Sequence, residues 1–157
     1  MSIRRATDQD RQGIWNVHLR AIREVCSGSY SEQQVTAWAN LLSPASYVAV
    51  VRERVLLVSE DAGCITGFGQ LNQASGEVEA VYVLPDRQRE GIGEALLRSL
   101  EEEARAAGFT KLSLSATLNA VPFYERCGYT REAPTVHRLA NGIDLPCVRM
   151  SKELASS

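Results

Sequence analysis

The stretch from Val83 to Leu97 constrains this chain most, because an apolar strand-like segment runs through a basic, glycine-bearing turn into an amphipathic helix. Gly91 and Gly93 lie in the turn and leave no Cβ in the way of a ligand. The first backbone N–H groups of a helix have no partner within it, and the helix dipole favours negative charge there. The segment therefore predicts an anion site whose ligand carries phosphates.

Two common phosphate-binding patterns do not fit this turn. The chain has no Gly-x-x-x-x-Gly-Lys-[Ser/Thr] sequence, which the phosphate loop of nucleotide triphosphatases requires. The dinucleotide fingerprint needs three glycines spaced Gly-x-Gly-x-x-Gly and an acidic residue about twenty positions later, and the glycine spacing here differs. The turn is therefore neither a phosphate loop of this type nor a dinucleotide-binding fingerprint.

Composition indicates one ordinary domain over residues 1–157, since 45% of the residues are hydrophobic and can bury a sizeable core. The formal net charge is −2 with acids and bases interspersed, which argues against nucleic-acid binding. No segment has the apolar length of a signal peptide or a membrane span. We therefore expect a cytoplasmic protein that binds neither nucleic acid nor membrane.

The sequence offers no metal site. Cys26, Cys64, Cys127 and Cys147 are widely separated, and the chain has only two histidines. We interpret the four cysteines as reduced thiols in the core. The acidic run at 101–103 is interpreted as a mostly solvent-exposed helix face.

Periodicity and turn signals predict an α/β fold. A strand at 3–6 is followed by two helices with capping-box starts near Thr7 and Ser31, and 44–52 is ambiguous but favours helix. Three antiparallel strands then form a meander, and the helix that starts near Gly93 crosses over to a strand parallel to the third one. A short helix at 119–127 and an Asn-Gly hairpin close the chain. The later strands are expected at 55–60, 64–72, 77–84, 111–116, 130–139 and 143–150.

Two motifs of the chain resemble the signatures of the GCN5-related N-acetyltransferase (GNAT) family. The turn reads Gln88-x-x-Gly91-x-Gly93, and a later segment reads Asn119-x-x-x-Phe123-Tyr124-Glu125-x-x-Gly128-Tyr129. The resemblance covers nearly the whole chain, residues 3–152. It implies a mixed, mostly antiparallel seven-stranded sheet flanked by about four helices, with a splayed central pair of parallel strands.

The resemblance also implies acetyl-CoA as the acyl donor, with no metal. The pantetheine arm would lie between the splayed strands, and the pyrophosphate would meet the amides at the start of the helix. Arg87 and Arg89 are expected near the phosphates, at least one of them in contact. Asn119 is expected as a helix cap and as a cofactor contact. The implied cofactor-binding residues are Val81, Tyr82, Val83, Gln88, Arg89, Glu90, Gly91, Ile92, Gly93, Glu94 and Asn119.

A base or a desolvating pocket is useful for acetyl transfer to an amine, because an alkylammonium with a pKa of about 10.4 is only about one part in a thousand neutral at pH 7. Glu79 is the preferred base, directly or through water, since family members often carry a carboxylate at this position. Tyr124 matches the family tyrosine that protonates the leaving thiolate. The alternatives are a solvent-facing strand residue for Glu79 and a core aromatic for Tyr124.

The acceptor site is expected between the first two helices and the closing hairpin, with Tyr30, Trp38 and His137 as candidate contacts. The acceptor would be a small molecule with a primary amine or an exposed protein amine. Transfer of another acyl group and a CoA-binding module without turnover remain alternatives. A homodimer is also left open, because many relatives pair.

Overall fold

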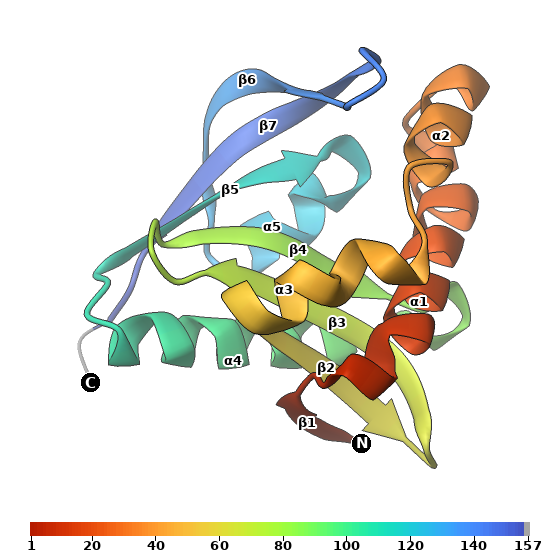
Figure 1. Cartoon of the computed structure of the whole chain (residues 1–157). Helices are drawn as coiled ribbons and strands as arrows, with labels where there is room; N and C mark the ends of the chain where they lie inside the picture. Colours follow the sequence, from red (N-terminus) through yellow and green to blue (C-terminus); the bar gives the residue numbers. More distant parts are fainter. Residues whose placement is uncertain (156–157) are drawn as a thin grey trace.

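The computed structural model describes residues 1–155, and these form a seven-stranded sheet in the order β1-β2-β3-β4-β5-β7-β6 (Figure 1). Every neighbouring pair is antiparallel except β4 and β5, which are parallel. The implied mixed sheet is therefore confirmed. The strands are β1 (Ser2–Arg5), β2 (Val55–Asp61), β3 (Cys64–Asn72), β4 (Glu77–Val83), β5 (Lys111–Thr117), β6 (Thr130–Arg138) and β7 (Asp144–Glu153).

Five α-helices accompany the sheet within residues 1–155, and α2 starts at its predicted capping box. The Ser31 hydroxyl accepts a hydrogen bond from the Gln34 amide at 3.1 Å, while the Ser31 amide donates to the Gln34 side chain at 2.9 Å. The ambiguous segment at 44–52 is helical, as a 3₁₀ turn (Pro44–Tyr47) continued by α3. No helix within residues 1–155 is both long and apolar enough to cross a membrane. The helices are α1 (Arg11–Glu24), α2 (Glu32–Ala39), α3 (Val48–Glu53), α4 (Ile92–Ala106) and α5 (Val121–Arg126).

The helices form a layer on each side of the sheet. Figure 1 shows α1 and α3 lying across β2–β4, with α4 on the opposite face of these strands. The buried side chains of α4, including Leu96, Leu97 and Leu100, pack against the sheet and α5 in the largest core cluster. This packing fixes the start of α4 relative to the end of β4.

The central parallel pair separates soon after it begins. Only Glu77 with Ser113 and Val78 with Leu114 are paired between β4 and β5, although β5 stays paired with β7 over its full length. The register between β3 and β4 also shifts at this point, so that Glu79 is an extra residue in β4. The predicted splay is confirmed, and it leaves one edge of β4 open beyond Val78.

Two expectations about burial were wrong. Glu101 is buried, with a side chain only 1% exposed, because it lies on the apolar stripe of α4 beside Leu97 and Ala104. Cys64 is exposed, whereas the other three cysteines are buried as expected. It is the first residue of β3, directly after the tight turn from β2, where the hairpin end projects into solvent.

Candidate active site

A cavity of about 540 Å³ opens where β4 and β5 separate. This volume is in the range typical of small-molecule sites. Its walls come from β4, from the turn between β4 and α4, from the last part of α1 and from the segment before and within α5. The lining residues are Ala21, Val25, Cys26, Val81, Tyr82, Val83, Arg87, Gln88, Arg89, Gly91, Ile92, Gly93, Glu94, Thr117, Asn119, Ala120, Pro122, Phe123, Arg126 and Cys127.

The open edge of β4 points backbone groups into this cavity. The Leu84 amide donates to the Thr66 carbonyl of β3 at 2.9 Å, so the polar groups of Leu84 face β3. Because successive residues of a strand present their backbone groups to opposite sides, those of Val81 and Val83 face the gap. The Gln88 side chain donates to the Val83 carbonyl at 3.4 Å, which leaves the Val81 groups free for a ligand.

The turn between β4 and α4 is an anion-binding segment. Arg89 (φ 70°) and Gly91 (φ 80°) both adopt the left-handed conformation, which turns successive N–H groups toward one side. None of the backbone N–H groups from Gln88 to Glu94 donates a hydrogen bond within residues 1–155. The first intrahelical bond runs from Ala95 to the Gly91 carbonyl at 3.0 Å. These amides are therefore available to a phosphate group.

The two glycines of the turn serve different purposes. A Cβ added to Gly91 would meet nothing within 4 Å, so Gly91 is needed for its positive φ and for the open space above the amides. A Cβ added to Gly93 would lie 3.3 Å from the Phe123 ring and 3.6 Å from Val83. Gly93 thus lets α4 approach α5 closely, a role that the sequence did not indicate.

Basic side chains border the cavity unequally. Arg87 already pairs with Asp61 at 2.7 Å and with Glu90 at 2.8 Å. Arg89 and Arg126 line the cavity and form no ion pair within the described part of the chain. Arg89 is therefore the better placed of the two expected arginines, and Arg126, at the end of α5, is an additional candidate.

Asn119 lines the cavity, whereas Tyr124 is not among the lining residues, although its neighbour Phe123 is. The expectation that Asn119 caps the helix was wrong, because Ala120 is the N-cap of α5 and Asn119 lies inside the preceding 3₁₀ turn. The Asn119 Oδ1 atom is buried without a hydrogen-bond partner, the only such side-chain atom in residues 1–155. Tyr124 is buried, its ring packs edge-on against Phe123 and Tyr129, and its hydroxyl has no hydrogen-bond partner among the described residues. Since an unpartnered buried acceptor is costly, the Asn119 oxygen is suited to receive a hydrogen bond from a ligand, and the Tyr124 hydroxyl is free to make one.

Glu79 lies outside the cavity lining. Its Oε1 atom accepts hydrogen bonds from Arg54 Nε and Gln70 Nε2, both at 2.8 Å, while Oε2 has no partner within residues 1–155. The side chain is 23% exposed. Glu79 is the bulge residue of β4 and directly follows the last residue paired with β5, so it lies where the two strands begin to separate.

The three expected acceptor contacts are not brought together. Tyr30 and Trp38 are buried in a core cluster with their rings 6.0 Å apart, and the Tyr30 hydroxyl donates to the Pro146 carbonyl and accepts from the Leu118 amide. His137 is exposed on the edge strand β6. None of the three lines the cavity. Tyr30 thus ties the start of α5 to β7 and has no free hydroxyl for a substrate.

His18 sits in an aromatic cage on the α1 side of the sheet. Its ring lies 4.5 Å from Tyr82 and 5.4 Å from Phe68, with Trp38 at 6.4 Å, and its Nδ1 shares a hydrogen bond of 2.8 Å with Tyr47 Oη. Burial lowers the pKa of His18 to about 3, and burial raises the pKa of both tyrosines. All three groups are therefore neutral at pH 7.

This cage predicts a loss of stability in mild acid. The unfolded chain takes up a proton on His18 below pH 6.5, while the folded chain does not until about pH 3, so stability falls as pH decreases between these values. Between pH 7 and pH 5 the free energy of unfolding should drop by about 2 kcal/mol. Urea unfolding at the two pH values measures it. His18→Asn should flatten this slope, His137→Gln should not, and equal slopes in all three proteins would contradict the prediction.

Among residues 1–155 no group of three or more His, Cys, Asp or Glu side chains is arranged to hold a metal ion. The cavity also contains Cys26, which sequence reasoning did not assign to the site. Burial raises the pKa of Cys26 to about 12, so its thiol is not a nucleophile at neutral pH. With Ala21 and Val25 it forms a cavity wall at the end of α1, and the helical spacing of these residues was a signal that could have identified it.

Comparison with known proteins gives this arrangement a family. The family described as the acetyltransferase (GNAT) domain matches residues 26–154. The uncharacterized N-acetyltransferase YafP of Escherichia coli is 26% identical over 129 residues, which cover 82% of this chain and 81% of YafP. The fold and these matches define an N-acetyltransferase, and the chain belongs to the GCN5-related N-acetyltransferase (GNAT) family.

Solved structures agree with this assignment. A GCN5-related N-acetyltransferase from Rhodopseudomonas palustris superposes with a TM-score of 0.91 at 26% identity, covering 98% of this chain and 95% of that one. The PaiA N-acetyltransferase of Thermoplasma acidophilum, solved in complex with coenzyme A, shares the fold with a TM-score of 0.80 at 20% identity, covering 97% and 98% of the two chains.

Proposed function

We propose that this chain transfers an acetyl group from acetyl-CoA to a primary amine, on a small molecule or exposed on a protein, by direct attack in a ternary complex. The observation that carries the proposal is the turn at the start of α4, where the amides from Gln88 to Glu94 have no acceptor within residues 1–155 and border a cavity. The diphosphate of CoA has the charge and the acceptor oxygens that such a turn binds. The free Oδ1 of Asn119 supports the same ligand, because a pantetheine arm carries amide N–H donors.

The proposed roles of the chain follow from the chemistry of the reaction. Bound acetyl-CoA supplies an acetyl group activated as a thioester, with a thiolate as the leaving group. The backbone N–H of Val81 faces the gap and is proposed to donate to the thioester oxygen as negative charge develops there. Tyr124 remains protonated at neutral pH, since burial raises its pKa, and is proposed to donate a proton to the sulfur.

The acceptor must lose a proton before it attacks. An alkylammonium with a pKa of about 10.4 carries a handicap of about 4–5 kcal/mol at pH 7. Glu79 is proposed to accept this proton through its Oε2 atom, directly or through a water molecule, while Arg54 and Gln70 hold Oε1 in place. Its position where β4 and β5 begin to separate suits an acceptor that enters from the α1 side.

An amine-panel assay tests the proposed function. The full chain is mixed with acetyl-CoA and each of a broad set of primary amines, amino sugars and peptides with free amines, and release of the CoA thiol is followed. Turnover with at least one amine and acetylation of that amine, detected by mass spectrometry, would support the proposal. Tight binding of acetyl-CoA by calorimetry with no thiol release from any amine would instead indicate a binding module.

Glu79→Gln should lower kcat at pH 7 by about 10-fold, because the amide cannot accept the proton. The deficit should shrink as the pH of the assay approaches the pKa of the amine, which then loses its proton to solvent. Glu77→Gln is the matched control on the same strand, since Glu77 is held by Arg149 at 2.6 Å. A pH-independent loss in Glu79→Gln, or an equal loss in Glu77→Gln, would argue against Glu79 as the base.

A further inference from the structure

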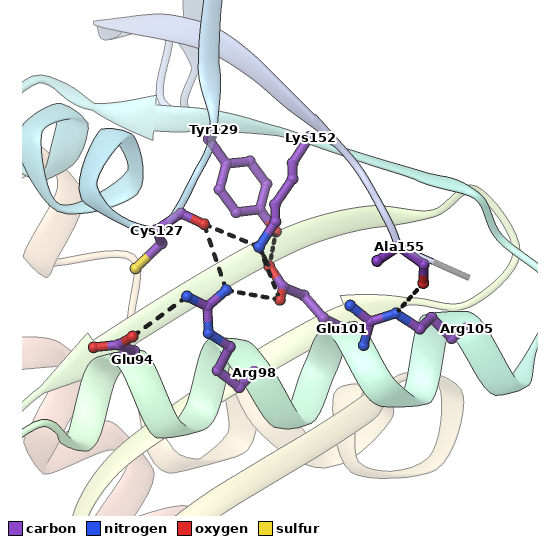
Figure 2. A network of polar contacts seen from close by, with 8 residues as sticks. All are labelled: Glu94, Arg98, Glu101, Arg105, Cys127, Tyr129, Lys152 and Ala155. Carbon is purple, nitrogen blue, oxygen red and sulfur yellow. Dashed lines mark hydrogen bonds and ion pairs between the residues drawn. The ribbon is translucent and has the colours of Figure 1, made fainter. Parts of the chain in front are cut away.

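The buried Glu101 is the centre of a polar cluster that joins three distant parts of the chain (Figure 2). Lys152 Nζ of β7 lies 3.0 Å from its Oε2, and Tyr129 Oη donates to the same atom at 2.9 Å. Arg98 Nη1, one turn earlier on α4, lies 3.2 Å from Oε1. The carboxylate, 1% exposed, is therefore enclosed by two cations and a hydroxyl. We call these four residues the Glu101 cluster.

The Glu101 cluster reaches the end of α5. Lys152 Nζ donates to the Cys127 carbonyl at 2.9 Å, and Arg98 Nη1 is 3.5 Å from the same oxygen (Figure 2). Cys127 is the C-cap of α5, so no backbone N–H of a further helical turn can donate to its carbonyl. A helix of six residues is too short to be stable alone and depends on such end contacts.

The cluster also contacts the residue proposed to protonate the leaving group. The Tyr129 ring packs edge-on against Tyr124, with centroids 5.8 Å apart, and the Tyr129 amide donates to the Tyr124 carbonyl at 3.0 Å. Tyr129 is therefore held at its hydroxyl by Glu101 and supports Tyr124 with its ring and backbone. Arg98 also pairs with Glu94 at 3.3 Å, and Glu94 lies in the first turn of α4, directly after the anion-binding turn.

A buried ionic cluster is a poor device for stability alone, because apolar side chains of similar volume often stabilise a core as well or better. What such a cluster does well is to fix the orientation of side chains, since each hydrogen bond constrains an angle as well as a distance. We propose that the Glu101 cluster is a positioning group that fixes the Tyr124 hydroxyl relative to the anion-binding turn of α4. This inference rests on the proposed function, and within it Glu101, Lys152 and Tyr129 act through Tyr124 without touching the substrates.

Tyr129→Phe is the decisive variant, because it removes one hydroxyl and keeps the ring. We expect kcat to fall by about 5- to 10-fold with the KM for acetyl-CoA changed less than about twofold, since a small displacement of a reacting group is costly. In a Tyr124→Phe background the same change should cause no further loss. Arg105→Gln is the control on the same helix, because within residues 1–155 the Arg105 side chain bonds only the Ala155 carbonyl, and its change should leave kcat unchanged.

Glu101→Gln, assayed below its melting temperature, is a second variant for the same comparison. Its loss of kcat should also vanish in the Tyr124→Phe background. An unchanged kcat in Tyr129→Phe, or a loss that repeats in full in the Tyr124→Phe background, would overturn the inference. Absence of turnover in the wild type would overturn the proposed function instead. In that case the inference is tested by amide hydrogen exchange at residues 121–129. Faster exchange in Tyr129→Phe but not in Arg105→Gln would support the inference, and unchanged exchange in Tyr129→Phe would overturn it.

Discussion

Gly91→Glu is expected to abolish acetyl-CoA binding. The new side chain would stand in the open space above the amides from Gln88 to Glu94, where its carboxylate can accept their hydrogen bonds and exclude the diphosphate. Two like charges about 4 Å apart near a protein surface repel by about 4 kcal/mol, so affinity should fall by about 10³-fold. Titration calorimetry with acetyl-CoA measures this change directly.

The loss of acetyl-CoA affinity in Gly91→Glu should not result from a loss of folding stability. A side chain at the φ of 80° of Gly91 costs about 1–2 kcal/mol, and a carboxylate at a helix N-terminus returns part of this. Gly108→Glu is the matched control, because Gly108 also has a positive φ with nothing within 4 Å of its Cβ position but lies at the other end of α4. It should be the less stable variant and yet bind acetyl-CoA normally. Similar affinities in Gly91→Glu and the wild type would show that the diphosphate binds elsewhere.

The order of the elements and the anion-binding turn were predictable because their signals are local. Caps, glycines and strand-length apolar runs each act within a few residues, and the parallel pairing of β4 with β5 follows from the single crossover through α4. The burial of Glu101 was not predicted, although it shares a helical stripe with Leu97 and Ala104. Its partners Tyr129 and Lys152 lie 28 and 51 residues away, and their approach depends on the whole sheet.

The acceptor residues show the same limit. Tyr30 and Trp38 are aromatic residues on adjacent segments, and the sequence cannot distinguish a core pair from the wall of a site. The cavity wall at the end of α1 is made of Ala21, Val25 and Cys26, whose small or apolar side chains carry no chemical signal. Which aromatic rings face a ligand is decided by tertiary packing, and that information is spread over the chain.

Tyr124→Phe should lower kcat by about 10²-fold and leave the KM for acetyl-CoA within about twofold of the wild type. The hydroxyl makes no hydrogen bond within residues 1–155, so its removal should cost little stability, and the ring keeps its contacts with Phe123 and Tyr129. A general acid contributes about 10²–10⁴-fold, and the lower end is expected because a thiol with a pKa of about 8.5 leaves without much help. Steady-state kinetics with the best amine of the panel measures both constants.

The pH dependence separates an acid from a packing residue. Burial raises the pKa of Tyr124 above its usual value near 10, so the phenol stays protonated, and the ratio of wild-type to variant kcat should be constant from pH 6 to pH 9. Tyr47→Phe is the control, because the Tyr47 hydroxyl bonds His18 outside the cavity, and its loss should cost about 1 kcal/mol of stability without lowering kcat. A wild-type rate in Tyr124→Phe would remove the acid from this mechanism and leave the thiolate to depart unaided.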